Sequence, residues 1–429
     1  MENLEKILID MKKASCKLAA FDVNTKNNAL KKIAENLNNS RESIIKENLS
    51  DIEQAEKDGL ASPLLKRLKL DNNKIDILIK GINDLISFED PVNKILGKTE
   101  LDDDLILTKV SVPIGVIGVI FESRPDALVQ ISTLCLKSGN CVILKGGKEA
   151  LRTNRILTKI IIDSILSISK DFDNTIFLLE TREDVNEILK YDKYINLIIP
   201  RGSNEFVQYI KKHSLIPVLG HADGICHVYV DKFADIDKAI KVTVDAKTQY
   251  VAVCNATETL LVHKDIAEKF LPLVKEALDK KNVRLKGCPK TKKILKDIEN
   301  ATEEDWKTEY LDYILSIKII DDIDEAIDHI NFYGSSHTDS IITENQDSIK
   351  KFTSLVDSSS VMVNASTRFA DGFVYGMGAE VGISTNKIHA RGPVGLDGLV
   401  IYKFILQGNG HILDDYAKGI KKFKHRKIL

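Results

Sequence analysis

One cysteine, Cys254, has the residue type and the setting for nucleophilic chemistry. It lies in the stretch Val244–Val262, after apolar residues at helical spacing and before the β-branched run Thr257–Val262. A junction between a predicted helix and a predicted strand is a place where a thiol can face a cleft. A thiolate attacks a carbonyl carbon far better than a thiol does. The alternative is a buried cysteine that acts only as a small apolar residue.

Two strand-loop-helix segments have the composition of anion sites. In Cys141–Ala150 a predicted strand leads into paired glycines and two lysines, and Ile198–Phe206 repeats this design with Gly202 and Ser203. Backbone N–H groups and cations at the carboxyl edge of a sheet suit a phosphate or a ribose. Two such loops favour a dinucleotide. Neither segment matches the GxGxxG fingerprint or a P-loop, so a structural turn with solvated lysines remains the alternative.

The apolar pattern predicts the elements that position these residues. Short, near-continuous apolar runs alternate with helix-length segments from Gly115 onward, as in parallel sheets that are covered on both faces. The sequence therefore predicts a doubly wound α/β domain, followed by a second α/β series that carries Cys254. The strands expected in the first domain are Gly115–Phe121, Cys141–Lys145, Thr175–Leu179, Ile195–Pro200 and Leu215–Leu219.

The remaining segments are expected to surround these sheets. Amphipathic helices are predicted within Leu4–Leu49 and over Ile75–Ile86. A hairpin over Leu96–Pro113 and a late strand, Gly398–Leu406, are predicted to pair with each other or with another subunit. The expected units are residues 1–95 and 113–224 for cofactor binding, 225–365 for catalysis, 96–112 and 394–412 for a β-arm, 366–393 for a substrate-site loop and 413–429 for a C-terminal tail.

Composition excludes several classes of protein. The 429 residues carry 61 lysines and arginines against 63 aspartates and glutamates, so no global field recruits nucleic acid or an acidic membrane. Charges interrupt the apolar positions of the N-terminus, and no run reaches the roughly 20 apolar residues of a membrane span. We therefore expect a cytoplasmic protein. The 6 cysteines form no CxxC pair and the 9 histidines lack ligand spacing, so no metal site is expected.

Seven segments in this order resemble the aldehyde dehydrogenase superfamily, and most closely its branch that reduces γ-glutamyl phosphate. The resemblance covers almost the whole chain and implies two doubly wound α/β domains with a small β-arm that joins subunits. The segments are VPIGVIGVIFESRPDA (Val112–Ala127), VILKGGKEA (Val142–Ala150), IIPRGSNEF (Ile198–Phe206), GICHVYVD (Gly224–Asp231), VAVCNATET (Val251–Thr259), TEYLDYILSIKIIDDIDEAI (Thr308–Ile327) and the long stretch Val363–Leu399.

The resemblance implies a role for individual residues. Cys254 matches the nucleophile, and Lys145 matches a lysine that contacts a cofactor ribose. Gly202 and Ser203 match the loop beside the pyrophosphate, and Glu309 matches a ligand of the nicotinamide ribose. A nicotinamide dinucleotide is therefore the expected cofactor.

Lys148 departs from the pattern of relatives that prefer NAD. Those relatives usually place an acid three residues after the lysine that matches Lys145, where it accepts from the adenosine ribose hydroxyls. A carboxylate repels a 2′-phosphate, whereas the ammonium of Lys148 attracts it. This departure favours NADP(H). A solvated surface lysine is the alternative.

The stretch Pro217–Gly224 differs from the superfamily pattern at the position of the general base. Hydrolytic aldehyde dehydrogenases carry a glutamate there that activates water against the thioester, but this stretch has no acid before Asp223. When no base activates water to attack the thioester, the acyl group on the cysteine can be transferred to phosphate instead. His221 is a candidate for proton transfer, with a structural histidine as the alternative.

Two arginines are candidate substrate ligands. Arg124 lies near the position of the asparagine that helps to form the oxyanion hole in the superfamily, and a guanidinium suits a phosphoryl group or a carboxylate. An ion pair between Arg124 and Glu122 is the alternative. Arg368 follows a predicted strand, Val361–Asn364, and could bind the α-carboxylate of a glutamate.

The resemblance implies NADPH-dependent reduction of L-glutamyl 5-phosphate to L-glutamate 5-semialdehyde and phosphate through a thioester on Cys254, the second step of proline biosynthesis. It also implies a homo-oligomer, and the labile acyl phosphate makes a complex with glutamate 5-kinase plausible. Two rivals stay open. One is an aldehyde dehydrogenase that passes the acyl group to coenzyme A, and the other is an interaction protein that keeps the fold without catalysis.

Overall fold

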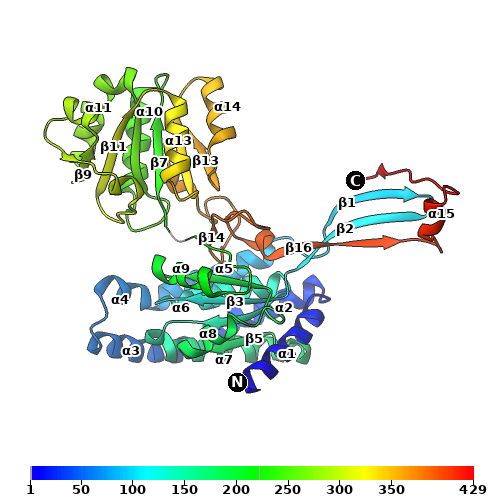
Figure 1. Cartoon of the computed structure of the whole chain (residues 1–429). Coiled ribbons are helices and arrows are strands. Elements are labelled where there is room, and N and C mark those ends of the chain that lie inside the picture. Colours follow the sequence, from blue (N-terminus) through cyan, green and yellow to red (C-terminus); the bar gives the residue numbers. More distant parts are fainter. Residues whose placement is uncertain (1, 222) are drawn as a thin grey trace.

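The computed structural model describes residues 2–221 and 223–429 and divides the chain into two α/β bodies and a projecting arm (Figure 1). The first body contains the N-terminal part of the chain, drawn in blue to green, and the second contains the green to orange part. The arm combines an early hairpin with the end of the chain. Two α/β bodies on parallel sheets and a small β-arm are the predicted fold class, which the structure confirms.

The first body is built on a parallel sheet in the order β5-β4-β3-β6. Its strands carry buried aliphatic side chains on both faces, which is why they appear as continuous apolar runs in the sequence. Helices α6 (Pro125–Lys137), α7 (Leu151–Ile168), α8 (Arg182–Ile188) and α9 (Asn204–His213) connect or follow these strands. The strands are β3 (Val116–Phe121), β4 (Cys141–Lys145), β5 (Ile176–Leu179) and β6 (Leu197–Arg201).

The predicted strand Leu215–Leu219 is wrong. The chain makes a single parallel bridge there, between Val218 and Ile198. Ile198 donates its N–H to the carbonyl of Pro217 (2.9 Å), and Leu219 donates to the carbonyl of Ile198 (2.9 Å). Pro217 has no N–H to extend a ladder, so the apolar run joins the sheet edge at one point and does not form a strand.

Five N-terminal helices pack against the first body. They include the predicted amphipathic helices and a short one, α4, that the sequence pattern did not reveal. Asp22 caps one of them, because its side chain accepts the N–H of Thr25 at 2.9 Å. The helices are α1 (Glu2–Leu18), α2 (Val23–Asn39), α3 (Arg41–Lys57), α4 (Ser62–Leu68) and α5 (Asn72–Ser87).

The second body is built on a parallel sheet in the order β10-β9-β11-β8-β7-β12-β13. Its helices are α10 (Ile236–Thr248), α11 (Lys264–Asp279), α12 (Pro289–Ile294), α13 (Ile323–Tyr333) and α14 (Gln346–Leu355). Its strands are β7 (Cys226–Val230), β8 (Thr257–His263), β9 (Arg284–Gly287), β10 (Glu299–Asn300), β11 (Ile314–Ile320), β12 (Thr338–Ile342) and β13 (Ser360–Val363).

The arm is an antiparallel sheet in the order β16-β2-β1-β17. The early hairpin, β1 (Ile95–Asp102) and β2 (Leu105–Pro113), pairs with β16 (Val400–Gln407), which confirms the predicted pairing. The last residues also fold onto the arm, because β17 (Arg426–Lys427) pairs with β1. A short helix, α15 (Leu413–Ala417), lies at the far end of the arm (Figure 1).

Short elements between the second body and the arm complete the chain. The strands β14 (Ile383–Ser384) and β15 (Gly392–Pro393) form a small antiparallel pair beside the first body (Figure 1). Within the described residues, no helix combines the length and the apolar character that crossing a membrane requires.

Candidate active site at the meeting of two sheet edges

The candidate residues of the second body precede strands instead of following them. Cys254 precedes β8, His221 precedes β7, His337 precedes β12 and Glu309 precedes β11. The strands β11, β8, β7 and β12 are parallel neighbours in this order. Their amino ends therefore share one edge of the sheet, and this edge brings together residues that are far apart in the sequence.

The candidate residues of the first body follow strands. Arg124 follows β3, Lys145 ends β4, and Gly202 and Ser203 follow β6. These positions form the carboxyl edge of a parallel sheet, where ligands of doubly wound folds bind. Arg201, the last residue of β6, lies near enough to Cys254 for the two charges to interact. The carboxyl edge of the first sheet thus meets the amino edge of the second around the thiol.

The Cys254 thiol is partly buried, and its resting form is protonated. Burial, together with the carboxylates of Glu309 and Glu380, raises its pKa to about 12. The backbone N–H of Cys254 and the guanidinium of Arg201 act in the opposite direction. At neutral pH the free protein therefore holds a thiol, and forming the nucleophile requires that bound ligands change these charges or that a base takes the proton.

Neighbouring groups fix the backbone around Cys254. The side-chain amide of Asn255 donates to the carbonyl of Ala370 (2.9 Å), and the hydroxyl of Thr367 donates to the carbonyl of Asn255 (2.7 Å). The thiol of Cys226 donates to the carbonyl of Cys254 itself (3.2 Å). These bonds connect the loop before β8 to the loop after β13, so the nucleophile lies on a supported turn.

Gly224 packs directly on the backbone of Cys254. A Cβ at this position would lie 2.0 Å from the Cys254 carbonyl oxygen and 2.3 Å from its Cα. The N–H of Gly224 also donates to the carboxylate of Glu309. Burial, together with the nearby Asp223 carboxylate, raises the pKa of Glu309 to about 7, although this hydrogen bond opposes the shift.

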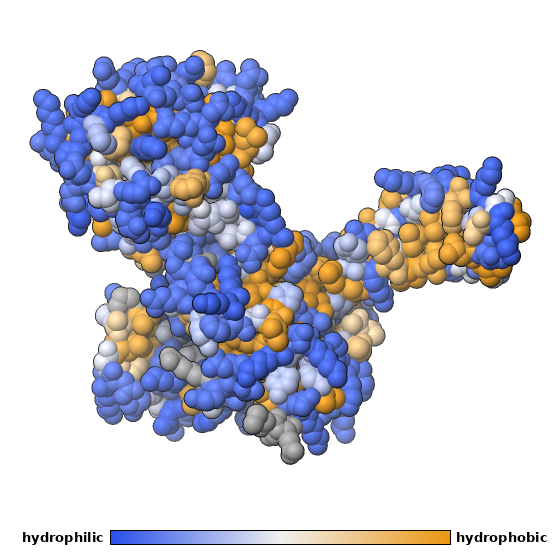
Figure 2. All heavy atoms as spheres, viewed as in Figure 1, coloured by the Kyte–Doolittle hydropathy of each residue, from blue (hydrophilic) through white to orange (hydrophobic). Residues whose placement is uncertain are grey.

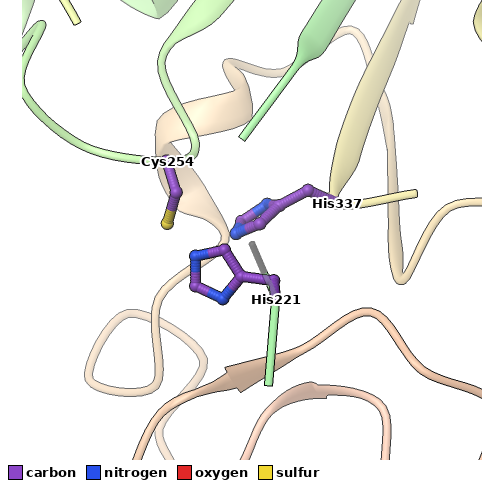
Figure 3. Close-up of side chains that lie close together, drawn as sticks. All are labelled: His221, Cys254 and His337. Carbon is purple, nitrogen blue, oxygen red and sulfur yellow. The ribbon is translucent and has the colours of Figure 1, made fainter. Parts of the chain in front are cut away.

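Two histidines lie beside the thiol. A ring nitrogen of His221, a ring nitrogen of His337 and the Cys254 Sγ all lie within 4.8 Å of one another, and Figure 3 shows the three side chains converging. The Nδ1 of His221 bonds to the carbonyl of Ile383 (3.0 Å). Burial lowers the pKa of both imidazoles, and that of His337 lies well below its ordinary value. Both rings are therefore neutral at physiological pH.

Arg124 forms an ion pair, but its partner differs from the predicted alternative. Its guanidinium contacts the carboxylate of Asp126 at 3.0 Å and stays about half exposed. The carboxylate of Glu122 instead accepts the N–H of Ser203 (3.3 Å). Arg124 thus lies at the mouth of the site, with part of its surface available to a ligand.

Arg368 lies in the short helical turn Thr367–Phe369, on the same side as Cys254. Its Nε donates to the side-chain oxygen of Gln249 at 2.9 Å. Burial lowers the pKa of its guanidinium, and the thiol of Cys254 is the largest opposing influence. Arg368 and Arg201 therefore both lie close enough to Cys254 to interact with it electrostatically.

A cavity beside β4 contains one of the candidate cofactor residues, Lys148. The side chains of Lys148, Arg152 and Arg155 line it together with residues of α3, including Asp51. Lys145 is buried at the end of β4, and its ammonium donates to the carbonyl of Gly146 (2.5 Å). Near the start of α7 the cavity combines these cations with carboxylates, which belong to Glu47, Asp51, Asp58 and Glu149.

Comparison with known proteins assigns the chain to a family. The model of the aldehyde dehydrogenase family matches residues 1–292, more than half of the chain. The chain is 62% identical over 426 residues to gamma-glutamyl phosphate reductase of Acetivibrio thermocellus, covering 99% of this chain and 98% of that protein. The chain belongs to the aldehyde dehydrogenase family. Within the family it groups with proteins of that name, and it is an oxidoreductase that acts on a small molecule.

Solved structures agree with this assignment to the aldehyde dehydrogenase family. Gamma-glutamyl phosphate reductase of Thermotoga maritima superposes with a TM-score of 0.91 at 42% identity, covering 95% of this chain and 99% of that one. An acetylating aldehyde dehydrogenase of Geobacillus thermoglucosidasius superposes with a TM-score of 0.64 at 16% identity, covering 96% and 97%, which shows a shared fold alone.

Three residues at this aldehyde dehydrogenase site were not among the sequence candidates. Arg201 and Glu380 both interact with the Cys254 thiol, and His337 is completely buried beside it. Arg201 stands in the predicted anion loop, so its signal was present in the sequence. His337 immediately precedes an apolar strand, as Cys254 nearly does, and only the strand order shows that these two positions are close.

Proposed function

We propose that the chain catalyses NADPH-dependent reduction of L-glutamyl 5-phosphate to L-glutamate 5-semialdehyde and phosphate, the second step of proline synthesis from glutamate. The observation that carries this proposal is the 62% identity, across 99% of the chain, to a protein named gamma-glutamyl phosphate reductase. The site supports it, because one thiol lies among arginines that suit a phosphoryl group and a carboxylate.

The Cys254 thiolate attacks the γ-carbonyl of the acyl phosphate, the C–O bond to phosphate breaks, and a thioester forms. The charge on the departing phosphate is balanced by guanidinium groups, of which Arg201 and Arg124 are nearest to the carboxyl edge of the first sheet. The backbone N–H of Cys254 donates to the oxyanion of each tetrahedral intermediate. Neutral His221 can accept the thiol proton, and Arg368 is the candidate ligand of the substrate α-carboxylate.

We propose that NADP(H) binds along the carboxyl edge of the first sheet, with its adenosine end at the cavity beside β4. When bound, the dinucleotide supplies hydride to the thioester carbonyl. Lys145 contacts a ribose in this proposal, the backbone at Gly202 and Ser203 faces the pyrophosphate, and Glu309 accepts hydroxyls of the nicotinamide ribose. Lys148 and its neighbours Arg152 and Arg155 offer cations for a 2′-phosphate. A solved relative at 16% identity is described as complexed with NADP, although this likeness concerns the fold.

The acyl acceptor distinguishes this function from its main rival. The rival is an aldehyde dehydrogenase that transfers the acyl group from Cys254 to coenzyme A. We expect oxidation of L-glutamate 5-semialdehyde by NADP to require inorganic phosphate, with coenzyme A unable to replace it. Initial rates with phosphate alone, coenzyme A alone, both and neither decide the question. Turnover with coenzyme A and without phosphate would assign the rival activity.

We further propose that the chain forms a homo-oligomer through its arm. Apolar side chains of β16 are exposed, and Figure 2 shows orange surface along the arm that contains this strand. Isolated exposed apolar residues are ordinary, but a contiguous group on an extended sheet marks an interface. A complex with the kinase that makes the acyl phosphate is compatible with the lability of that substrate. The exposed group consists of Ile401, Tyr402, Phe404, Ile405 and Leu406.

A further inference from the structure

The three side chains around the nucleophile also have the composition of a metal site. His221, Cys254 and His337 each offer one ligand atom, and these atoms lie within 4.8 Å of one another (Figure 3). Two imidazoles and one thiolate form a donor set that suits Zn²⁺. Ligand atoms around a tetrahedral zinc stand roughly 3.3 to 3.6 Å apart at ordinary bond lengths, so small side-chain rotations would close the site.

His337 provides an independent indication that this site takes a ligand. Its side chain is completely buried, and its Nε2 has no hydrogen-bond partner within the described part of the chain. Its Nδ1 is engaged, because it lies 2.8 Å from the hydroxyl of Thr338. A buried polar atom without a partner is costly and requires an explanation. A cation held between His337 and the thiol would satisfy it.

The hydrogen bonds of the two imidazoles leave the Nε2 atom of each ring available to a metal. The Nδ1 of His337 lies beside the Thr338 hydroxyl, whereas its Nε2 has no partner within the described residues. The Nδ1 of His221 contacts a carbonyl, which can only accept, so this nitrogen carries the hydrogen and Nε2 keeps its lone pair. The carboxylates of Glu309 and Glu380, close to the thiol, compensate part of an incoming positive charge.

We propose that a zinc ion binds reversibly to His221, Cys254 and His337 and inhibits the enzyme by capping its nucleophile. The Cys254 Sγ–H bond breaks, its proton passes to bulk water, and one Zn–S and two Zn–N bonds form without any change of oxidation state. The fourth position remains for water. The binding claim stands on the side-chain cluster alone, whereas the inhibition claim rests on the proposed function.

Metal binding can be measured without turnover. We expect the reduced, chelator-treated full-length protein to bind one Co²⁺ per chain with a thiolate-to-cobalt charge-transfer band, and Zn²⁺ to displace it. Loss of a residue that hydrogen-bonds a metal ligand weakens metal binding by up to roughly 100-fold, so we expect loss of a ligand itself to weaken zinc binding by at least this factor. The variants are Cys254→Ser, His221→Asn and His337→Asn, with exposed Cys16→Ser and His425→Asn as matched controls.

The outcomes separate the two claims. Binding without a thiolate band, or equal zinc affinity in Cys254→Ser, His337→Asn and the parent, overturns the site. Cys254→Ser changes one atom and His221 lies on a partly exposed loop, so these two variants keep the test valid if His337→Asn unfolds. Zinc should inhibit semialdehyde oxidation at the concentration at which it binds, and chelator should restore the rate. Zinc binding without inhibition overturns the claim that zinc inhibits the enzyme. If the protein shows no semialdehyde oxidation at all, the proposed function is contradicted, and the cobalt spectrum alone decides whether the metal site exists.

Discussion

At the scale of single residues, the site combines a thiol whose pKa is high with carboxylates whose pKa values are also raised by burial. The free protein therefore holds its nucleophile in an unreactive form, and ligand binding must supply the charges that activate it. Such an arrangement protects the thiol from adventitious alkylation and oxidation, because both reactions need the thiolate.

Glu309 should make cofactor binding depend on pH. Its pKa is raised to about 7 by burial, so the side chain is mostly protonated below pH 7 and a carboxylate above it. A carboxylate accepts ribose hydroxyls better than a carboxylic acid does, so NADPH affinity should rise as the pH increases through 7. Fluorescence titrations at pH 6, 7 and 8 measure this slope. Glu309→Gln should flatten it, and an unchanged slope in that variant would assign the titration to another group.

Lys148 should determine the choice between the two nicotinamide cofactors. Lys148→Glu removes an ammonium and adds a carboxylate in the cavity beside β4. A lost charge-assisted hydrogen bond is worth about 1.5 to 3 kcal/mol, so the KM for NADPH should rise roughly 10- to 100-fold. The KM for NADH, which has no 2′-phosphate, serves as the internal control and should change little. Equal increases for both cofactors would place Lys148 outside the phosphate site.

At the scale of elements, the turn before β7 supports the turn that carries the nucleophile. Gly224→Ala would place a methyl group 2.0 Å from the Cys254 carbonyl oxygen, so the nucleophile must move. A displacement of about 1 Å can cost roughly 100-fold in rate, and we expect a decrease in kcat of this size. Gly81→Ala is the matched control, because nothing lies within 4 Å of a Cβ at this helical position. That control should keep full activity and gain about 0.5 to 1 kcal/mol of stability. A fully active Gly224→Ala would contradict the supporting role.

Most helices and strands could be predicted from the sequence, whereas the contacts between distant elements could not. Apolar runs predicted β4, and the alternating hairpin and late strand were predicted to pair either with each other, as the structure shows, or with another subunit. The run Leu215–Leu219 has the same apolar pattern, but Pro217 prevents a ladder. The closeness of His337 to Cys254 depends on strand order, and the interaction of Arg201 with the thiol depends on how two bodies pack. No local pattern encodes either one.

At the scale of the whole molecule, the arm projects an apolar sheet away from both bodies (Figures 1 and 2). Phe404 is 59% exposed on this sheet, and we expect Phe404→Asp to shift the protein to a smaller assembly because a buried unpaired charge opposes association. Light scattering coupled to gel filtration measures the mass. Phe332→Asp, on a side chain that is 77% exposed on α13, is the control and should leave the mass unchanged. An unaltered mass in Phe404→Asp would remove the arm from the interface.

The whole account depends on an acyl group carried by Cys254 and released to phosphate. The direct measurement is peptide mass spectrometry after mixing the enzyme with semialdehyde and NADP without phosphate, followed by an acid quench that protonates the substrate amine. We predict a glutamyl adduct on the peptide containing Cys254, its disappearance when phosphate is added before the quench, and its absence in Cys254→Ala. An adduct on another cysteine, or an adduct at Cys254 that water removes as fast as phosphate does, would contradict the account.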